Sequence, residues 1–381
     1  MCFQICKFYY NVCSECYKVN CFCPFCYTPT REGWQRNFQL FVSCVSSVIG
    51  AVSLQQDHRV LRCLSDRGLP GFMFCGVKFK KVVINGHKCE WMYPPGIDFT
   101  PPSIDTVDAG KLDEIDLKQR LAEQAPENKI ILYIHGGAFV LCTPSTQRMM
   151  LAEMVKKTGL IVLAIDYPRP PEAPYPVPVD ACESVYDWLT TSMAVPPSRL
   201  LVGGDSAGGC LTLTLAARLR DNKKPLPSQL LLLSPWVDLT QTSGASWDGF
   251  DQVDIIRNKP WAIKAASMYV GDAAVHETSP AHFKSLAGLP ETLLIWGGSE
   301  MLCDQITKFG QQLVDSGVDV KQMCYSTMHH VVPLFADTGQ AEPQDSLRAI
   351  RAFAAGEEYP YKIELWSPPD KNTADGTDVA A

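Results

Sequence analysis

Residues 200–217, LLVGGDSAGGCLTLTLAA, decide the fold of this chain. The apolar run Leu200-Leu201-Val202 predicts a short strand, and Leu211–Ala217 predicts a helix soon afterwards. The turn between them, Gly204-Asp205-Ser206-Ala207-Gly208, has small residues on both sides of the serine because a sharp, strained turn leaves no room for side chains. Such a turn holds the Ser206 hydroxyl at the carboxyl edge of a sheet. There it can act as a nucleophile if the chain also supplies a base, an orienting acid and an oxyanion hole.

Strands and helices alternate on both sides of this turn. Helices are expected over 149–157 and 178–191, and Asn85-Gly86 predicts a hairpin between strands at 77–84 and 89–93. Further short strands are expected at 130–134, 160–165, 230–233, 292–296 and 318–325. Continuous apolar strands separated by helices indicate an α/β fold, with a mainly parallel central sheet flanked by helices on both faces.

A glycine-rich segment follows the strand expected at 130–134. Its sequence is His135-Gly136-Gly137-Ala138-Phe139, and the adjacent glycines let backbone N–H groups approach a ligand without a side chain in the way. At the carboxyl end of that strand, the N–H groups of Gly136 and Gly137 can meet the N–H of Ala207 and hold a negatively charged oxygen. His135 itself is interpreted as a structural residue that ties this loop down.

Size and charge exclude some classes of protein. A chain of 381 residues can bury the core of one large α/β domain. The net charge of -7 leaves no basic surface for nucleic acid, so nucleic acid is not expected as a partner. The composition, 46% hydrophobic and 20% charged, is that of an ordinary globular protein.

The amino-terminal 30 residues form a cysteine-rich tail. Seven of the 16 cysteines fall in the first 26 residues, and interrupting charges make the stretch a poor secretory signal. Reduced thiols and an intracellular, cytoplasmic location are therefore expected. Two Cys-x2-Cys pairs, Cys13/Cys16 and Cys23/Cys26, suggest zinc, but the short spacing between the pairs favours a poorly ordered or membrane-surface tail. Acylation of these thiols stays open.

An uncharged apolar stretch runs from Phe38 to Leu54. It is short for a membrane span and is diluted by serines, so a helix packed on the domain is favoured over a membrane contact. Peripheral or anchored membrane association through residues 1–54 remains an alternative.

Taken together, these motifs resemble the hormone-sensitive lipase family of α/β-hydrolases. The resemblance rests on His135-Gly136-Gly137 and Gly204–Gly209, with support from the segment Asp166–Pro176 and from Ser279-Pro280 followed by Leu289-Pro290. It covers about residues 75–355 and implies the α/β-hydrolase fold with a helical cap. Ala138 departs from the family by replacing its usual third glycine.

The resemblance also implies a catalytic acid and a base. Glu300, in Gly298-Ser299-Glu300-Met301-Leu302-Cys303-Asp304, takes the place of the family's orienting aspartate. Asp304 is the rival, although it fits a helix-start or supporting role better. Met328-His329-His330 offers two histidines, and the register favours His330 as the base, with His329 as a neighbour on the loop surface. Ala138, Phe139, Asp205 and Tyr167 are expected to contact the substrate.

The expected organisation is a single hydrolase domain with two tails. The domain spans 31–355, with cap elements at 31–70 and 239–285 and a catalytic core at 75–238 and 286–355. The cysteine-rich tail covers 1–30, and a polar tail covers 356–381. Trp247, Phe250, Trp261 and Tyr269 in the cap suggest an apolar pocket, although they can equally form the core of the cap.

The predicted activity is cleavage of a small-to-medium hydrophobic ester, such as an acetylated lipid, sterol or secondary metabolite. Ser206, Glu300 and His330 would form the triad, and no metal or organic cofactor is expected. Two alternatives stay open: acyl transfer by the same triad, and a non-catalytic small-molecule receptor of the same fold. The retained His330 argues against the receptor, whereas the sequence cannot separate transfer from hydrolysis. The oligomeric state stays undetermined.

Overall fold

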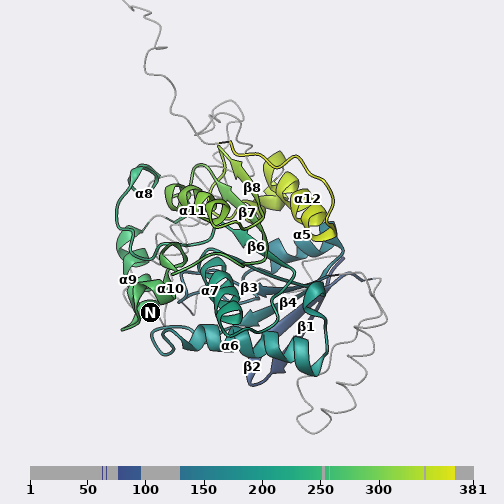
Figure 1. Cartoon of the computed structure of the whole chain (residues 1–381). Coiled ribbons are helices and arrows are strands. Elements are labelled where there is room, and N and C mark those ends of the chain that lie inside the picture. Colours follow the sequence, from purple (N-terminus) through teal and green to yellow (C-terminus); the bar gives the residue numbers. More distant parts are fainter. Residues whose placement is uncertain are drawn as a thin grey trace, which may run out of the picture.

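The computed structural model describes Arg62, Asp66 and residues 76–95, 129–250, 254–256, 258–338 and 340–364. One eight-stranded sheet, in the order β1-β2-β4-β3-β5-β6-β7-β8, runs through the centre of the molecule (Figure 1). The strands are β1 (Lys78–Ile84), β2 (His87–Tyr93), β3 (Ile130–Ile134), β4 (Ile161–Asp166), β5 (Leu200–Asp205), β6 (Gln229–Leu233), β7 (Glu291–Gly297) and β8 (Val320–Tyr325). The β1–β2 and β2–β4 pairs are antiparallel, and all the other pairs are parallel.

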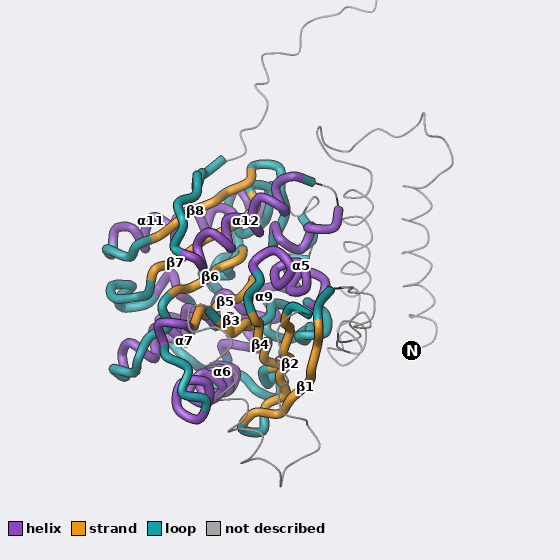
Figure 2. The backbone as a smooth tube through the Cα atoms, turned by 90° about the vertical axis from the view of Figure 1, so that its right-hand side faces the viewer, coloured by secondary structure: helices purple, strands orange, loops and turns teal. Residues whose placement is uncertain are grey.

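Helices cover both faces of this sheet, as Figure 2 shows edge-on. Helices α6 (Val177–Asp187), α7 (Ala207–Asp221) and α11 (Cys303–Asp315) pack into the core on one face. Helices α5 (Arg148–Thr158) and α12 (Ala341–Ala355) pack into the core on the other. This double cover explains why the central strands are apolar along most of their length, since both faces of a parallel sheet are removed from water.

The two edges of the sheet differ in how they are protected. At one edge, β1 exposes Lys78 and Lys81, and charged side chains discourage pairing with another chain. At the other edge, the segment after α12 returns beside β8. The N–H of Cys324 donates to the carbonyl oxygen of Lys362 (3.0 Å), and the N–H of Glu364 donates to that of Cys324 (3.0 Å).

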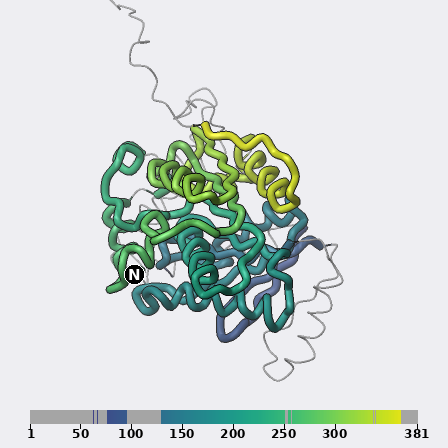
Figure 3. The backbone as a smooth tube through the Cα atoms, viewed as in Figure 1, coloured from purple at the N-terminus to yellow at the C-terminus, as the bar shows by residue number. Residues whose placement is uncertain are grey.

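The described residues of the insertion between β6 and β7 include three α-helices. They are α8 (Ala245–Gly249), α9 (Lys259–Val270) and α10 (Val275–Thr278), which lie together along the left side of the view in Figure 3. Asn258 caps α9 by accepting a hydrogen bond from the N–H of Trp261 (2.9 Å). The described parts of the chain also include the π-turn η2 (Trp188–Ser192) and the 3₁₀ turns η3 (Pro197–Arg199), η4 (Pro280–His282) and η5 (Val332–Thr338).

The sequence predicted this architecture correctly. The α/β fold, the mainly parallel sheet and the Asn85-Gly86 hairpin are confirmed, with strand and helix ends within a few residues of those expected. Of the polar tail predicted at 356–381, the structure describes the part up to Glu364, where Ile363 pairs with Cys324 of β8. Several expectations lie outside the described residues: the cysteine tail with its zinc hypothesis, the 38–54 stretch, most of the cap element at 31–70, and residues 365–381.

No helix in the described parts of the chain is long and apolar enough to cross a bilayer.

Candidate active site

Ser206 lies at a strained turn between β5 and α7. Its φ of 53° and ψ of -119° fall in a region that side-chain-bearing residues rarely adopt. Neighbouring elements hold this conformation: the Ser206 N–H donates to the carbonyl oxygen of Leu233 (2.9 Å), and its carbonyl oxygen accepts from the N–H of Trp236 (2.9 Å). Gly208 is required because a Cβ there would lie 2.7 Å from the carbonyl oxygen of His135 and closer still to that of Ile134. Close packing thus fixes the serine at the carboxyl end of the sheet.

The loop after β3 presents two half-buried backbone N–H groups. Gly137 (φ 108°) and Ala138 (φ 51°) have consecutive positive φ angles, and both remain partly exposed, whereas Gly136 is buried. The N–H of Gly136 donates to Oδ1 of Asp205 (2.9 Å), so it is engaged within the fold. The N–H of Gly136 was expected to contribute to an oxyanion hole, but it already donates a hydrogen bond within the protein. The N–H groups of Gly137 and Ala138 donate no such hydrogen bond among the described residues.

Asp205 anchors this loop to the nucleophile turn. Besides Gly136, its carboxylate accepts hydrogen bonds from the Tyr133 hydroxyl (2.7 Å) and the Gln147 side-chain amide (3.2 Å). Burial raises the pKa of Asp205, and the hydrogen bonds from Tyr133 and Gly136 counteract that rise. The residue preceding the serine thus joins the two loops that were expected to form the site.

His330 and Glu300 meet at the ends of β8 and β7. The Nδ1 atom of His330 lies 3.3 Å from Oε2 of Glu300, at ion-pair distance but without the alignment of a hydrogen bond. The other ring nitrogen, Nε2, is buried and has no hydrogen-bond partner among the described residues. Burial alone would lower the pKa of His330, but Glu300 raises it above its usual value. An imidazole beside one carboxylate, with its second nitrogen free of any hydrogen bond to the described residues, has the chemistry of a general base.

Known proteins with the α/β-hydrolase fold are similar to this chain in sequence and in structure. A family model described as the alpha/beta hydrolase fold matches residues 131–334. The chain is 32% identical over 241 residues to an esterase of Acinetobacter venetianus, covering 62% of this chain and 78% of the relative. It is 33% identical over 207 residues to an acetyl-hydrolase of Streptomyces hygroscopicus, covering 54% and 68%. The crystal structure of an esterase from the bacterial hormone-sensitive lipase family superposes with a TM-score of 0.66 at 27% identity, covering 82% of this chain and 97% of that one.

This chain belongs to the hormone-sensitive lipase family of α/β-hydrolases. By class it is a carboxylic ester hydrolase.

Sequence reasoning missed two buried polar residues beside the acid and the base. The Ser234 hydroxyl donates to Oε2 of Glu300 (2.7 Å) and accepts from the N–H of Val331 (2.9 Å). Asp254, in the insertion, accepts from the N–H of Met301 (2.8 Å). Ser234 directly follows β6, and its place at the carboxyl end of a strand is the signal that could have found it. Nothing in the local sequence marks Asp254.

The structure separates the rival residues at the acid and base positions. Oδ2 of Asp304 accepts from the N–H of Ser246 (2.7 Å), so this carboxylate joins α11 to the insertion, and it lies in the first turn of α11. His329 is fully buried, and its ring packs 6.2 Å from that of Phe335. The expectation that His329 lies on the loop surface was therefore wrong, because the loop turns inward and encloses both histidines.

Three residues expected to contact substrate also make close contacts within this hydrolase. Phe139 stacks on Tyr269 of the insertion with ring centroids 3.9 Å apart. Tyr167 stacks on His135 (4.3 Å), and its hydroxyl donates to the carbonyl oxygen of that residue (3.0 Å). Burial lowers the pKa of His135 to about 3, so this histidine is neutral, which suits a structural role. For Phe139, Tyr167 and the multiply bonded Asp205, direct contact with substrate stays a prediction.

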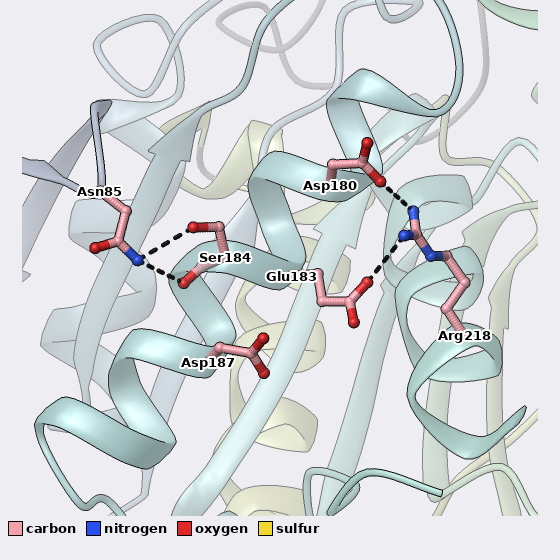
Figure 4. Close-up of a pocket in the computed structure, with 6 residues that line it drawn as sticks. All are labelled: Asn85, Asp180, Glu183, Ser184, Asp187 and Arg218. Carbon is pink, nitrogen blue, oxygen red and sulfur yellow. Dashed lines mark hydrogen bonds and ion pairs between the residues drawn. The ribbon is translucent and has the colours of Figure 1, made fainter. Parts of the chain in front are cut away.

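A surface hollow of about 400 Å³ lies away from this cluster (Figure 4). Arg218, one of its lining residues, is some twelve residues along α7 from Ser206, roughly 18 Å at 1.5 Å per residue. Asp180 and Glu183 of α6 form ion pairs with this arginine. The hollow is lined by Asn85, Asp180, Glu183, Ser184, Asp187 and Arg218. Its paired charges belong to the contact between α6 and α7, and none of its residues is a candidate for the family's chemistry.

Proposed function

We propose that this protein hydrolyses carboxylic esters with Ser206 as nucleophile, His330 as general base and Glu300 as the group that orients the histidine. The observation that carries the proposal is the His330–Glu300 pair, on the loops that follow β8 and β7. Nδ1 of His330 lies 3.3 Å from Oε2 of Glu300, and Nε2 has no hydrogen-bond partner among the described residues. The strained φ of Ser206 supports it, because strain of this kind is retained at functional sites.

The oxyanion hole is assigned to the N–H groups of Gly137, Ala138 and Ala207. Gly136 is left out of this set because its N–H donates to Asp205. Successive backbone N–H groups in a turn form concave anion sites, and Gly137 and Ala138 lie in the turn that follows β3. Ala207, at the start of α7, adds an N–H and the positive end of the helix dipole. The methyl group of Ala138 does not remove its N–H.

The reaction follows from these roles. His330 takes the proton of the Ser206 hydroxyl as its oxygen attacks the ester carbonyl, and the oxyanion donors hold the tetrahedral intermediate. His330 then gives that proton to the leaving alcohol. Water repeats the sequence on the acyl-enzyme, which releases the acid and restores the serine. Glu300 keeps the imidazole in the tautomer that presents Nε2 to the serine.

A small acyl group on a hydrophobic alcohol is the proposed substrate class. The acetyl-hydrolase of Streptomyces hygroscopicus is a relative at 33% identity, which favours a short acyl chain. Phe139, Tyr269 and Trp236 form an aromatic cluster that joins the oxyanion loop to the insertion, with Phe139 and Trp236 centroids 5.9 Å apart. Such a cluster suits an apolar ester, for example an acetylated lipid, sterol or secondary metabolite.

Hydrolysis of p-nitrophenyl acetate, butyrate and octanoate by the wild type and by Ser206→Ala tests the proposal. We expect the acetate and butyrate esters to be preferred, and activity to fall by several orders of magnitude in the variant. Equal rates in both proteins would refute the role of Ser206. A second alcohol added to the assay separates hydrolysis from acyl transfer, because transfer yields the new ester in place of the free acid.

A further inference from the structure

Asp254 is a fully buried carboxylate that reaches from the insertion to two loops of the proposed site. Its Oδ2 accepts from the N–H of Met301, directly after Glu300, at 2.8 Å. Its Oδ1 accepts from the N–H of His330 at 3.3 Å and from that of Ile255 at 2.7 Å. One side chain thus holds the backbone of the base and the backbone next to the acid, each with a different oxygen.

A second set of bonds from the insertion holds the same loop. The Ser246 hydroxyl of α8 donates to the carbonyl oxygen of Met301 (2.9 Å) and accepts from the N–H of Asp304 (3.0 Å). The peptide groups of Met301 are therefore bonded on both their N–H and C=O sides by residues of the insertion. The loop that carries Glu300 takes its shape from a segment 47 to 58 positions earlier in the chain.

The charges around His330 give Asp254 an electrostatic role as well. The carboxylates of Glu300, Asp254 and Asp205 all favour the protonated imidazole and raise the pKa of His330. Burial raises the pKa of Asp254 itself to about 6; His330 opposes that rise and Glu300 adds to it. Since His330 and Asp254 each shift the pKa of the other, the two groups lose their protons in coupled steps.

We propose that Asp254 is a positioning residue that assembles the Glu300–His330 pair and makes that assembly depend on the insertion. The inference rests on the proposed function for its kinetic consequences. If the insertion moved, the Asp254 carboxylate would no longer accept from the N–H groups of Met301 and His330. The imidazole of His330 would then lose its alignment with Glu300. The same carboxylate adds negative charge beside the base, so it also sets the pH at which His330 becomes neutral.

Asp254→Asn is the decisive variant, because it keeps the size of the side chain and removes its charge. The amide can accept from only one of the two loop N–H groups and presents its own N–H₂ to the other. We expect kcat to fall about ten- to hundredfold, as for a small misplacement of a catalytic group, with KM almost unchanged. Loss of the negative charge lowers the pKa of His330, so the acid limb of the pH–rate profile moves to lower pH.

Asp304→Asn is the matched control. It removes one carboxylate from the same contact between the insertion and α11, where Asp304 accepts from the N–H of Ser246. We expect its pH–rate profile to keep the wild-type position. If both variants moved the acid limb equally, or if Asp254→Asn lowered only thermal stability and left kcat and the limb in place, the positioning role would be overturned.

Two further measurements keep the inference testable when turnover or folding fails. Asp254→Glu retains the charge on a longer side chain, so kcat should fall while the acid limb stays; a limb shifted as in Asp254→Asn would refute the electrostatic role. The proton NMR titration of His330, assigned with His330→Gln, needs no substrate. A lowered His330 pKa in Asp254→Asn supports the inference even if the wild type hydrolyses no ester, a result that would refute only the proposed function.

Discussion

Replacing Gly208 by alanine should push helix α7 away from the end of strand β3, beside the turn that carries Ser206. Gly208 lies in the first turn of α7 and packs against the end of β3. A Cβ at this position would lie 2.7 Å from the carbonyl oxygen of His135, about 0.6 Å inside the ~3.3 Å at which carbon and oxygen normally touch. The contact with Ile134 would be closer. Because the atoms it meets are backbone, no side chain can rotate away.

The expected cost is therefore at the upper end for overpacking, about 3 kcal/mol. Relief requires α7 to move away from β3, and that movement carries Ser206 and the His135–Ala138 loop apart. We expect the loss of esterase activity to exceed what the unfolded fraction explains, since a shift of about 1 Å in a reacting group can cost roughly a hundredfold.

Gly249→Ala is the matched control, because it also lies in a helix and a Cβ there would have nothing within 4 Å. This change should be neutral or stabilise the protein by about 0.4–1 kcal/mol. Urea unfolding of both variants, followed with p-nitrophenyl butyrate hydrolysis, gives the comparison. If Gly208→Ala were as stable and as active as Gly249→Ala, the argument that close backbone packing fixes the serine would be wrong.

Three further predictions concern the surroundings of the site and the sheet. Ser234→Ala removes a hydrogen-bond donor to Glu300 and the acceptor of the Val331 N–H. We therefore expect kcat to fall and the free energy of unfolding in urea to decrease by about 1–3 kcal/mol. An unchanged kcat would contradict a role for Ser234 in holding Glu300. Because the pKa of His330 is raised above 6.5, kcat/KM should fall with decreasing pH from a point above that value. Protonated His330 should stabilise the folded protein fully at low pH, and this stabilisation should be lost as the pH rises through the raised pKa. With rising pH the activity should therefore increase while this part of the stability decreases. A kcat/KM that stays constant down to pH 6 would exclude His330 as the base. Arg148→Met should destabilise the protein by about 3 kcal/mol in a thermal or urea melt by leaving Glu90 buried without its ion pair (2.8 Å), and Glu90→Leu in the same chain should recover much of that loss.

The fold was predictable because its signals are local. The apolar runs of β3 to β7 and the Gly204–Gly208 turn each lie within a few consecutive residues, and a parallel sheet needs little else to be recognised. Glu300 and His330, named from short motifs, do meet in space.

The remaining contacts at the site join residues far apart in the chain. The N–H of Gly136 is engaged by Asp205, 69 positions away, and that bond removes it from the proposed oxyanion hole. Asp254 and His330 are separated by 76 positions, and Ser234 and Glu300 by 66. No periodicity or motif records which buried hydrogen-bond donor finds which acceptor across such distances. The inward turn of the His329 loop was hidden for the same reason.

The strand-like segment beside β8 has a practical consequence for anyone who shortens this chain. Lys362 and Glu364 occupy the outward-facing hydrogen-bonding groups of Cys324, and a shortened protein that ended at α12 would leave them bare. Uncovered strand edges recruit strands from other molecules and cause aggregation. The segment from 356 to 364 thus protects this edge against self-association, and a truncated protein that precipitates would report the loss of this protection rather than damage to the catalytic centre.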